Sequence, residues 1–484
     1  MRVQGDHHRR SLQPVILSAA KDLRSTQREI LRCAQDDSRA EVNAYGATTG
    51  VALRKMLLTL TKVDTVRYQQ NRVVPRCSLP LAPDRERVFL SPFSGYKERK
   101  GESMVAQIEQ RRVSGRPSSA TTDPVLTYTF DVLPLQRGGQ LGPVTLAYET
   151  WGTLNAEGDN AVLITHALTG NTHAHDAEYP DDLKAAWWNP LIGPGRPFDT
   201  SRYFVICSNV LGSCYGSTGP PSIDPQTGRR YGMNFPVITI RDIVNAQRRL
   251  LKHLGVRQLA MVAGGSIGGQ QALEWAVSYP ELVRKAVVVA ATAALTAQAL
   301  AFSEVERQAI MADPQWQNGN YAPGEGPRAG LAIARMLAMI TYQSEEGMEK
   351  RFGRRFAGYQ GTPAPSGVGT LGERFDVESY LYYQGESLVK RFDANSYLYL
   401  SRAMDLYDVS EGYVSLEAAL RRICSKALFI GIRSDFLFPA ARIRELAEQV
   451  RAVGGDASYV ELDSPHGHDA FLKEWQQMTN TLSL

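Results

Sequence analysis

The hydrophobic pattern of the chain becomes regular from Tyr128 onward. Apolar and polar residues alternate over 128–132 and 144–149, with Gly138 and Gly139 between them, which predicts two strands joined by a turn. Continuous apolar runs follow at 161–165, 203–208, 259–263, 285–290 and 427–432. Such runs are typical of strands buried on both faces. Several of them precede helical patterns, so the sequence predicts an α/β fold with a mainly parallel sheet and helices on both faces.

The strand pattern fades between about residues 302 and 415. Within this part, residues 330–342 carry apolar side chains at helical spacing, with polar ones between. We therefore predict an inserted helical cap at 302–415, between a first core segment at 121–301 and a second core segment at 416–484.

Residues 1–120 hold no sustained helical or strand period. They are basic, with 22 Lys and Arg against 12 Asp and Glu in residues 1–117, whereas the rest of the chain has 32 against 38. The basic residues are scattered among acids, so the pattern favours a disordered extension over a surface for nucleic acid or a membrane. The apolar stretch before Lys21 is too short for a secretory signal, and acids argue against a transit peptide. Met104 offers an alternative start of translation.

Composition narrows the class of protein further. The 484 residues are 43% hydrophobic and 21% charged, within the ordinary globular range, and no run of about 18 apolar residues predicts a membrane span. The five cysteines have no CxxC spacing, so neither a disulfide framework nor a zinc ribbon is indicated. We therefore expect a protein of the reducing cytoplasm.

The sharpest chemical motif lies at Gly264-Gly265-Ser266-Ile267-Gly268, between an apolar run and a helical pattern. A serine in this strand, turn and helix context is held above the sheet, where the glycines leave room for the cramped turn. The amide of Ile267, at the start of the helix, can stabilise an oxyanion. We predict that Ser266 is a nucleophile.

A serine needs a base and an orienting acid, which follow it in chain order in this context. Only His466 and His468 lie downstream, both in a loop after the predicted strand 458–462, and the residues alone leave the choice between them open. Asp435 follows the apolar run 427–432 and is the candidate acid. The alternative is that Asp435 caps the next helix and the histidines only stabilise a loop.

The loop after the apolar run 161–165 supplies the second expected oxyanion donor, the amide of Leu168. His173 and His175 of the same loop could share a metal ion, but no acid or cysteine lies at a clear ligand spacing, and we predict no metal site. Cys214 is a rival nucleophile, but it does not lie at a sharp turn between a strand and a helix as Ser266 does. A packed loop thiol is therefore favoured.

Taken together, the chain over about residues 124–478 resembles the homoserine O-acetyltransferase family of the α/β-hydrolase superfamily. The matching stretches are 148–152 (YETWG), 166–170 (HALTG), 209–220 (NVLGSCYGSTGP), 264–276 (GGSIGGQQALEWA), 392–401 (FDANSYLYLS) and 464–471 (SPHGHDAF).

The resemblance implies an α/β-hydrolase fold and an acyltransferase of methionine biosynthesis. It implies that Ser266 takes an acetyl group from acetyl-CoA and passes it to the hydroxyl of L-homoserine, with Asp435 as acid and His468, in the GHD element, as base. Acetyl-CoA is then a substrate, no cofactor is bound permanently, and a homodimer is expected.

The resemblance also implies substrate contacts. Asp469 holds the substrate amine, and Arg335, with Tyr342, binds the substrate carboxylate. The sequence departs from the commonest family pattern at Ile267 and Gln270, where methionine is usual, and at Ser213, where glycine is usual. Acyl selectivity is therefore open: the alternatives are a homoserine or serine O-succinyltransferase, an esterase-type hydrolase of the same fold, and a noncatalytic binding module.

Overall fold

The computed structural model of the chain describes residues 125–179, 182, 185–357 and 374–483. The predicted extension at 1–120 and the alternative start at Met104 lie outside these residues. None of the helices within the described residues has the length and apolar character needed to cross a bilayer.

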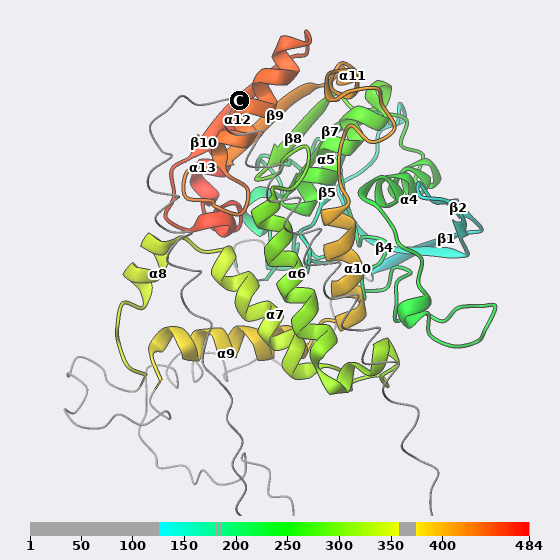
Figure 1. Cartoon of the computed structure of the whole chain (residues 1–484). Helices are drawn as coiled ribbons and strands as arrows, with labels where there is room; N and C mark the ends of the chain where they lie inside the picture. Colours follow the sequence, from blue (N-terminus) through cyan, green and yellow to red (C-terminus); the bar gives the residue numbers. More distant parts are fainter. Residues whose placement is uncertain (1–124, 180–181, 183–184, 358–373, 484) are drawn as a thin grey trace, which may run out of the picture. The chain divides into compact units, whose positions relative to one another are not determined.

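The centre of the fold is a mainly parallel sheet (Figure 1). In spatial order its strands are β1 (Leu126–Phe130), β4 (Val144–Trp151), β6 (Phe204–Ser208), β5 (Ala161–Thr165), β7 (Leu259–Gly265), β8 (Lys285–Val289), β9 (Lys426–Ile432) and β10 (Ala457–Leu462). The pairs β1–β4 and β4–β6 are antiparallel, and the pairs from β6 to β10 are parallel. The short strands β2 (Leu133–Pro134) and β3 (Gln140–Leu141) pair separately. The predicted fold class is confirmed.

Each central strand contributes to two apolar cores. In β5, Val162 and Ile164 belong to one cluster of buried residues and Leu163 belongs to the other. Successive side chains of a strand point to opposite faces, so both faces of the sheet must be covered. The apolar runs of the sequence are uninterrupted because both faces of these strands are buried.

Helices cover the sheet and extend beyond it. Their bounds are α4 (Ile240–His253), α5 (Ile267–Ser278), α6 (Ala297–Ala312), α7 (Arg328–Thr341), α8 (Glu345–Arg351), α9 (Asp376–Val389), α10 (Ala394–Asp405), α11 (Leu416–Leu420), α12 (Ala440–Ala452) and α13 (Trp475–Leu482). Short 3-10 segments lie at Asn189–Leu191, Gly232–Asn234, Pro280–Leu282, Pro314–Gly319 and Gly467–Leu472.

The helices α6, α7, α8, α9 and α10 follow one another between β8 and β9 in the chain and lie below these two strands in Figure 1. Helix α7 packs against both α6 and α9. The helical pattern expected at 330–342 corresponds to α7, and the first of these helices begins at Ala297, a few residues before the predicted start of the cap.

Candidate active site

Ser266 occupies the sharp turn between β7 and α5. Its φ and ψ angles are 61° and −129°, a backbone conformation that non-glycine residues rarely adopt. The Ser266 amide donates to the carbonyl of Val289 on the neighbouring strand β8, at 3.0 Å, which anchors the turn. A rare conformation that the surrounding structure holds in place is characteristic of functional positions.

Two glycines of the motif make this turn sterically accessible. A Cβ atom on Gly264 would overlap the side chain of Thr165 at the end of β5, and one on Gly268 would overlap the Thr165 carbonyl. The turn and the first turn of α5 therefore lie directly against β5. Only glycine at both positions permits this close approach.

Asp435 and His468 form a buried pair. Asp435 follows β9, His468 follows β10, and the His468 Nδ1–H group donates to Asp435 Oδ2 at 2.7 Å. The other carboxylate oxygen, Oδ1, accepts from the amides of Leu437 and Phe438, both at 2.9 Å. Asp435 thus orders the turn before α12, as the alternative reading expected, and orients the imidazole at the same time.

The electrostatic surroundings of His468 suit a base. Burial is the largest effect and favours the neutral ring, but the charge and hydrogen bond of Asp435, with the charge of Asp469, raise the pKa of His468 above 6.5. The ring stacks on Phe438 with centroids 5.1 Å apart and meets Phe471 edge-on at 5.7 Å. These aromatic contacts and the Asp435 carboxylate hold the ring in its orientation.

The second ring nitrogen, His468 Nε2, is buried and has no hydrogen-bond partner among the described residues. The bond from Ser266 Oγ to this nitrogen is therefore not formed here. The Phe471 ring, which contacts His468, also lies where a Cβ of Gly265, the residue before Ser266, would fall. Catalytic hydrogen bonds are often long in a free enzyme and tighten when substrate binds.

The loop after β5 carries Leu168, the candidate second oxyanion donor. His166 holds this loop: its Nδ1–H group donates to the Ala167 carbonyl at 2.8 Å, and its Nε2 accepts from the Val210 amide at 3.1 Å. Complete burial lowers the pKa of His166 to about 4, so the ring is neutral in this arrangement. The Ile267 amide begins α5, where the amide has no partner within the helix.

The candidate substrate contacts come together beside His468. Tyr342 caps the C-terminus of α7, and its ring centroid lies 5.7 Å from that of His468. The guanidinium carbon of Arg335 lies 5.7 Å from the Tyr342 ring centroid. The amide of Asp469 donates to the Tyr342 carbonyl at 3.2 Å, and Gln343 Nε2 donates to Asp469 Oδ2 at 2.8 Å.

A buried glutamate in the same region has no counterpart in the sequence predictions. Glu306 of α6 accepts a hydrogen bond from the Tyr397 hydroxyl of α10 at 2.8 Å. Burial raises the pKa of Glu306 to about 7, against the opposing charge of Arg335. Its position on α6 gave no signal, because an isolated glutamate in a helical pattern is normally a solvated residue.

The other histidines and the candidate cysteine have different surroundings. The half-buried His466 has its Nε2 atom 4.0 Å from Glu474 Oε1, and no contact with Asp435 is found among the described residues. His173 Nδ1 bonds Glu149 at 3.0 Å, whereas His175 Nδ1 bonds Asn189 at 2.7 Å, so the two rings have separate partners. Within the described residues, no group of three or more His, Cys, Asp or Glu is arranged to hold a metal. Burial raises the pKa of Cys214 to about 11, which keeps it a thiol.

Known proteins are similar to this chain over most of its described residues. The sequence model of the alpha/beta hydrolase fold family matches residues 160–474. The homoserine O-acetyltransferase of Carboxydothermus hydrogenoformans is 51% identical over 355 residues, which cover 73% of this chain and 93% of that protein.

Two solved structures are similar over nearly their whole length. The homoserine O-acetyltransferase from Bacillus anthracis is 29% identical with a TM-score of 0.69, over 75% of this chain and 98% of that chain. Esterase E22 is 30% identical with a TM-score of 0.66, over 74% and 99%.

The parallel sheet, the serine elbow between β7 and α5, and the family match place the chain in the class of α/β-hydrolase-fold proteins. Within that class, the chain belongs to the homoserine O-acetyltransferase family, a family of acyltransferases.

Proposed function

We propose that this enzyme transfers an acetyl group from acetyl-CoA to the hydroxyl of L-homoserine through an acyl-serine intermediate on Ser266, as a step of methionine biosynthesis. The observation that carries the proposal is the buried Asp435–His468 pair, in which His468 Nε2 has no partner among the described residues. The Phe471 ring contacts both His468 and Gly265, the residue before Ser266. A base held by a carboxylate and left with one open nitrogen is what a serine nucleophile needs.

In the first half of the reaction, His468 Nε2 takes the proton of the Ser266 hydroxyl while Oγ attacks the thioester carbonyl. The amides of Leu168 and Ile267 stabilise the resulting oxyanion. The bond from carbon to sulfur then breaks, and the proton on His468 passes to the departing thiolate of CoA. Ser266 is left as an acetyl ester.

In the second half, the homoserine hydroxyl gives its proton to His468 and attacks the acetyl ester. Arg335 binds the substrate carboxylate and Asp469 its ammonium group, so the hydroxyl is held close to the ester. Collapse of the second oxyanion returns the proton to Ser266 Oγ and releases O-acetylhomoserine. Positioning the acceptor in this way favours transfer over reaction with water.

The test is mass analysis of the enzyme after incubation with acetyl-CoA alone. We expect an acetyl adduct on the peptide that contains Ser266, absent from the Ser266→Ala variant and removed when homoserine is added. Steady-state transfer without any adduct, or an adduct on another residue, would contradict the covalent mechanism.

An esterase is the second candidate, because esterase E22 is as similar in structure as an acetyltransferase is. The two are separated by following acetyl-CoA consumption with and without homoserine. An acetyltransferase consumes the donor faster when homoserine is present, whereas consumption that is independent of homoserine supports the esterase. Succinyl-CoA and serine, tested in parallel, decide the acyl group and the acceptor.

The proposal extends to compartment and assembly. The described cysteines, Cys207, Cys214 and Cys424, are unpaired, which suits a cytoplasmic enzyme in a reducing environment. We propose a homodimer in solution, which sedimentation analysis of the full chain tests directly.

A further inference from the structure

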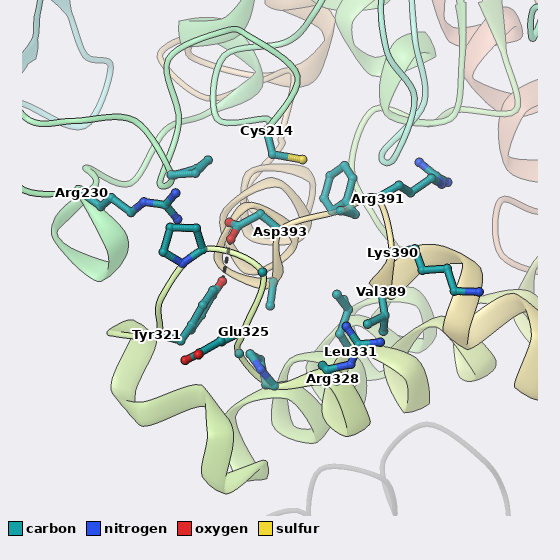
Figure 2. Close-up of a pocket in the computed structure, with 17 residues that line it drawn as sticks. Cys214, Arg230, Tyr321, Glu325, Arg328, Leu331, Val389, Lys390, Arg391 and Asp393 are labelled. Carbon is teal, nitrogen blue, oxygen red and sulfur yellow. Dashed lines mark hydrogen bonds between the residues drawn. The ribbon is translucent and has the colours of Figure 1, made fainter. Parts of the chain in front are cut away.

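Two adjoining cavities lie away from Ser266, Asp435 and His468. Their volumes are about 280 and 730 Å³, and Pro221, Arg230, Tyr321 and Asp393 line both. The walls come from the segment before α4, the segment between α6 and α7, and the junction of α9 and α10. Figure 2 shows Arg230 on one side of the first cavity, with Lys390 and Arg391 on the opposite side.

Positive charge dominates the lining of these cavities. The basic lining residues are Arg229, Arg230, Arg328, Lys390 and Arg391, against only Glu325 and Asp393. Asp393 is already engaged, since it accepts from the Tyr321 hydroxyl at 2.7 Å and caps α10 through the Ser396 amide at 2.8 Å.

None of the five basic side chains forms an ion pair with a carboxylate among the described residues. Uncompensated charges of one sign around a hollow create a local potential that attracts ligands of the opposite sign. The cavity therefore suits an anionic ligand.

The rim of the first cavity reaches the loop of the candidate oxyanion donor. Arg391 Nη1 donates to the carbonyl of Thr169 at 2.8 Å and to the Tyr215 hydroxyl at 2.9 Å. Thr169 directly follows Leu168. A long ligand can therefore place an anionic end among the basic residues and a reactive end near the Leu168 amide.

We propose that these cavities bind the phosphate groups at the nucleotide end of a CoA-type acyl donor. The inference rests on the proposed function, because it assigns a place to the phosphates of the donor whose thioester reacts at Ser266. Arginine binds phosphate oxygens in a planar, bidentate geometry, so Arg230 and Arg328 are the principal contacts. Arg391 acts at the boundary between the phosphates and the arm that leads to the thioester.

The test compares two acyl donors that differ in their phosphates. Acetyl-CoA carries them, and the acetyl thioester of N-acetylcysteamine does not. In the Arg230→Gln and Arg328→Gln variants we expect the KM for acetyl-CoA to rise about tenfold each, the usual effect of losing one charge-assisted hydrogen bond. The kcat/KM for the short donor and the KM for homoserine stay unchanged.

Arg421→Gln is the matched control. Arg421 is an exposed arginine at the C-terminus of α11, at the opposite end of Figure 1 from α7 and α9. This variant keeps the wild-type KM for both donors. The proposal would be overturned if the control raised the KM for acetyl-CoA as much as the cavity variants do. The loss of any positive charge would then explain the effect.

A binding measurement separates this inference from the proposed function. Calorimetry of the full-length Ser266→Ala variant with adenosine 3′,5′-bisphosphate requires no catalysis, and we expect binding that weakens about tenfold with each cavity substitution. If the wild type transfers acetyl from acetyl-CoA and neither substitution changes the KM or the nucleotide binding, the cavities are not the phosphate site, and the proposed function is unaffected. If the wild type transfers acetyl from neither donor but the nucleotide still binds, the proposed function is wrong, and the cavities remain an anion-binding site.

Discussion

The loop after β5 and the loop after β10 both bury histidines, but they use them differently. In the first loop, both nitrogens of His166 are engaged by backbone groups, and His173 and His175 bond Glu149 and Asn189. In the second loop, Asp435 engages one nitrogen of His468 and the other has no partner among the described residues.

A buried polar atom without a partner costs free energy, so proteins rarely leave one unless it serves another purpose. Both ring nitrogens of His166 form hydrogen bonds that support the fold, whereas only Nδ1 of His468 does so. Both histidines are buried, so burial does not separate them; the open Nε2 of a ring held by Asp435 is the feature that favours His468 as the candidate base.

The largest expected effect is that of His468→Ala. If His468 is the base, its removal should lower kcat for acetyl transfer by about 10⁶-fold, the loss found on removing the triad histidine of a serine protease, with the circular dichroism spectrum unchanged. The matched control is His466→Ala, two residues away and half-buried beside Glu474, which should keep wild-type kcat. A large loss in His466→Ala with a small one in His468→Ala would reverse the assignment of the base.

Asp435→Asn should lower kcat by about 10⁴-fold, because the amide no longer holds the imidazole in the required tautomer. It should also move the pH profile. In the wild type, the rate falls as pH drops through the His468 pKa, which Asp435 helps to raise above 6.5. Without that carboxylate, burial lowers the pKa and the acid limb moves to lower pH.

A pre-steady-state measurement of Ser266 acylation across the pH range follows this shift. An acid limb that stays in place in Asp435→Asn would mean that the limb belongs to another group. The buried Glu306, whose pKa is raised to about 7, is the first to examine.

The strands and the serine elbow were predictable because their signals are local. The apolar run at 161–165 coincides with β5, and close contacts with the end of that strand require the glycines at 264 and 268. The order of Ser266, Asp435 and His468 along the chain follows from the fold, in which successive parallel strands end at the same edge.

The choice between His466 and His468 was not predictable from the residues alone. Both lie in one loop, and only the resemblance distinguished them before the distance of 2.7 Å to Asp435 did. Glu306 and Tyr397 were missed for the same reason. They lie 91 positions apart, on α6 and α10, and only the packing of those helices joins them.

His166→Ala probes the structural side of the comparison. The Val210 amide loses its acceptor and the loop of Leu168 loses a support, so we expect kcat to fall about 10- to 100-fold, less than removal of an oxyanion donor outright. Because the pKa of His166 is about 4, the loss should be the same at every assay pH above 6. A loss confined to acid pH would instead mean that the ring titrates in function.

The smallest expected effect is that of His173→Gln, which should leave kcat unchanged. The hydrogen bond to Glu149 raises the pKa of His173 above 6.5, and the charges of Glu149 and Asp176 add to this against the effect of burial. A raised folded-state pKa means that the ring stabilises the fold fully below its unfolded pKa and loses this contribution as pH rises through the folded value.

Urea denaturation should therefore show wild type more stable than His173→Gln by about 1 kcal/mol near pH 5.5, with a smaller difference at pH 8.5. An equal difference at both pH values would show that His173 acts through packing alone. A fall in kcat alongside the stability change would place His173 with His166 as a support of the Leu168 loop, and the two histidines would then have to be tested as a pair.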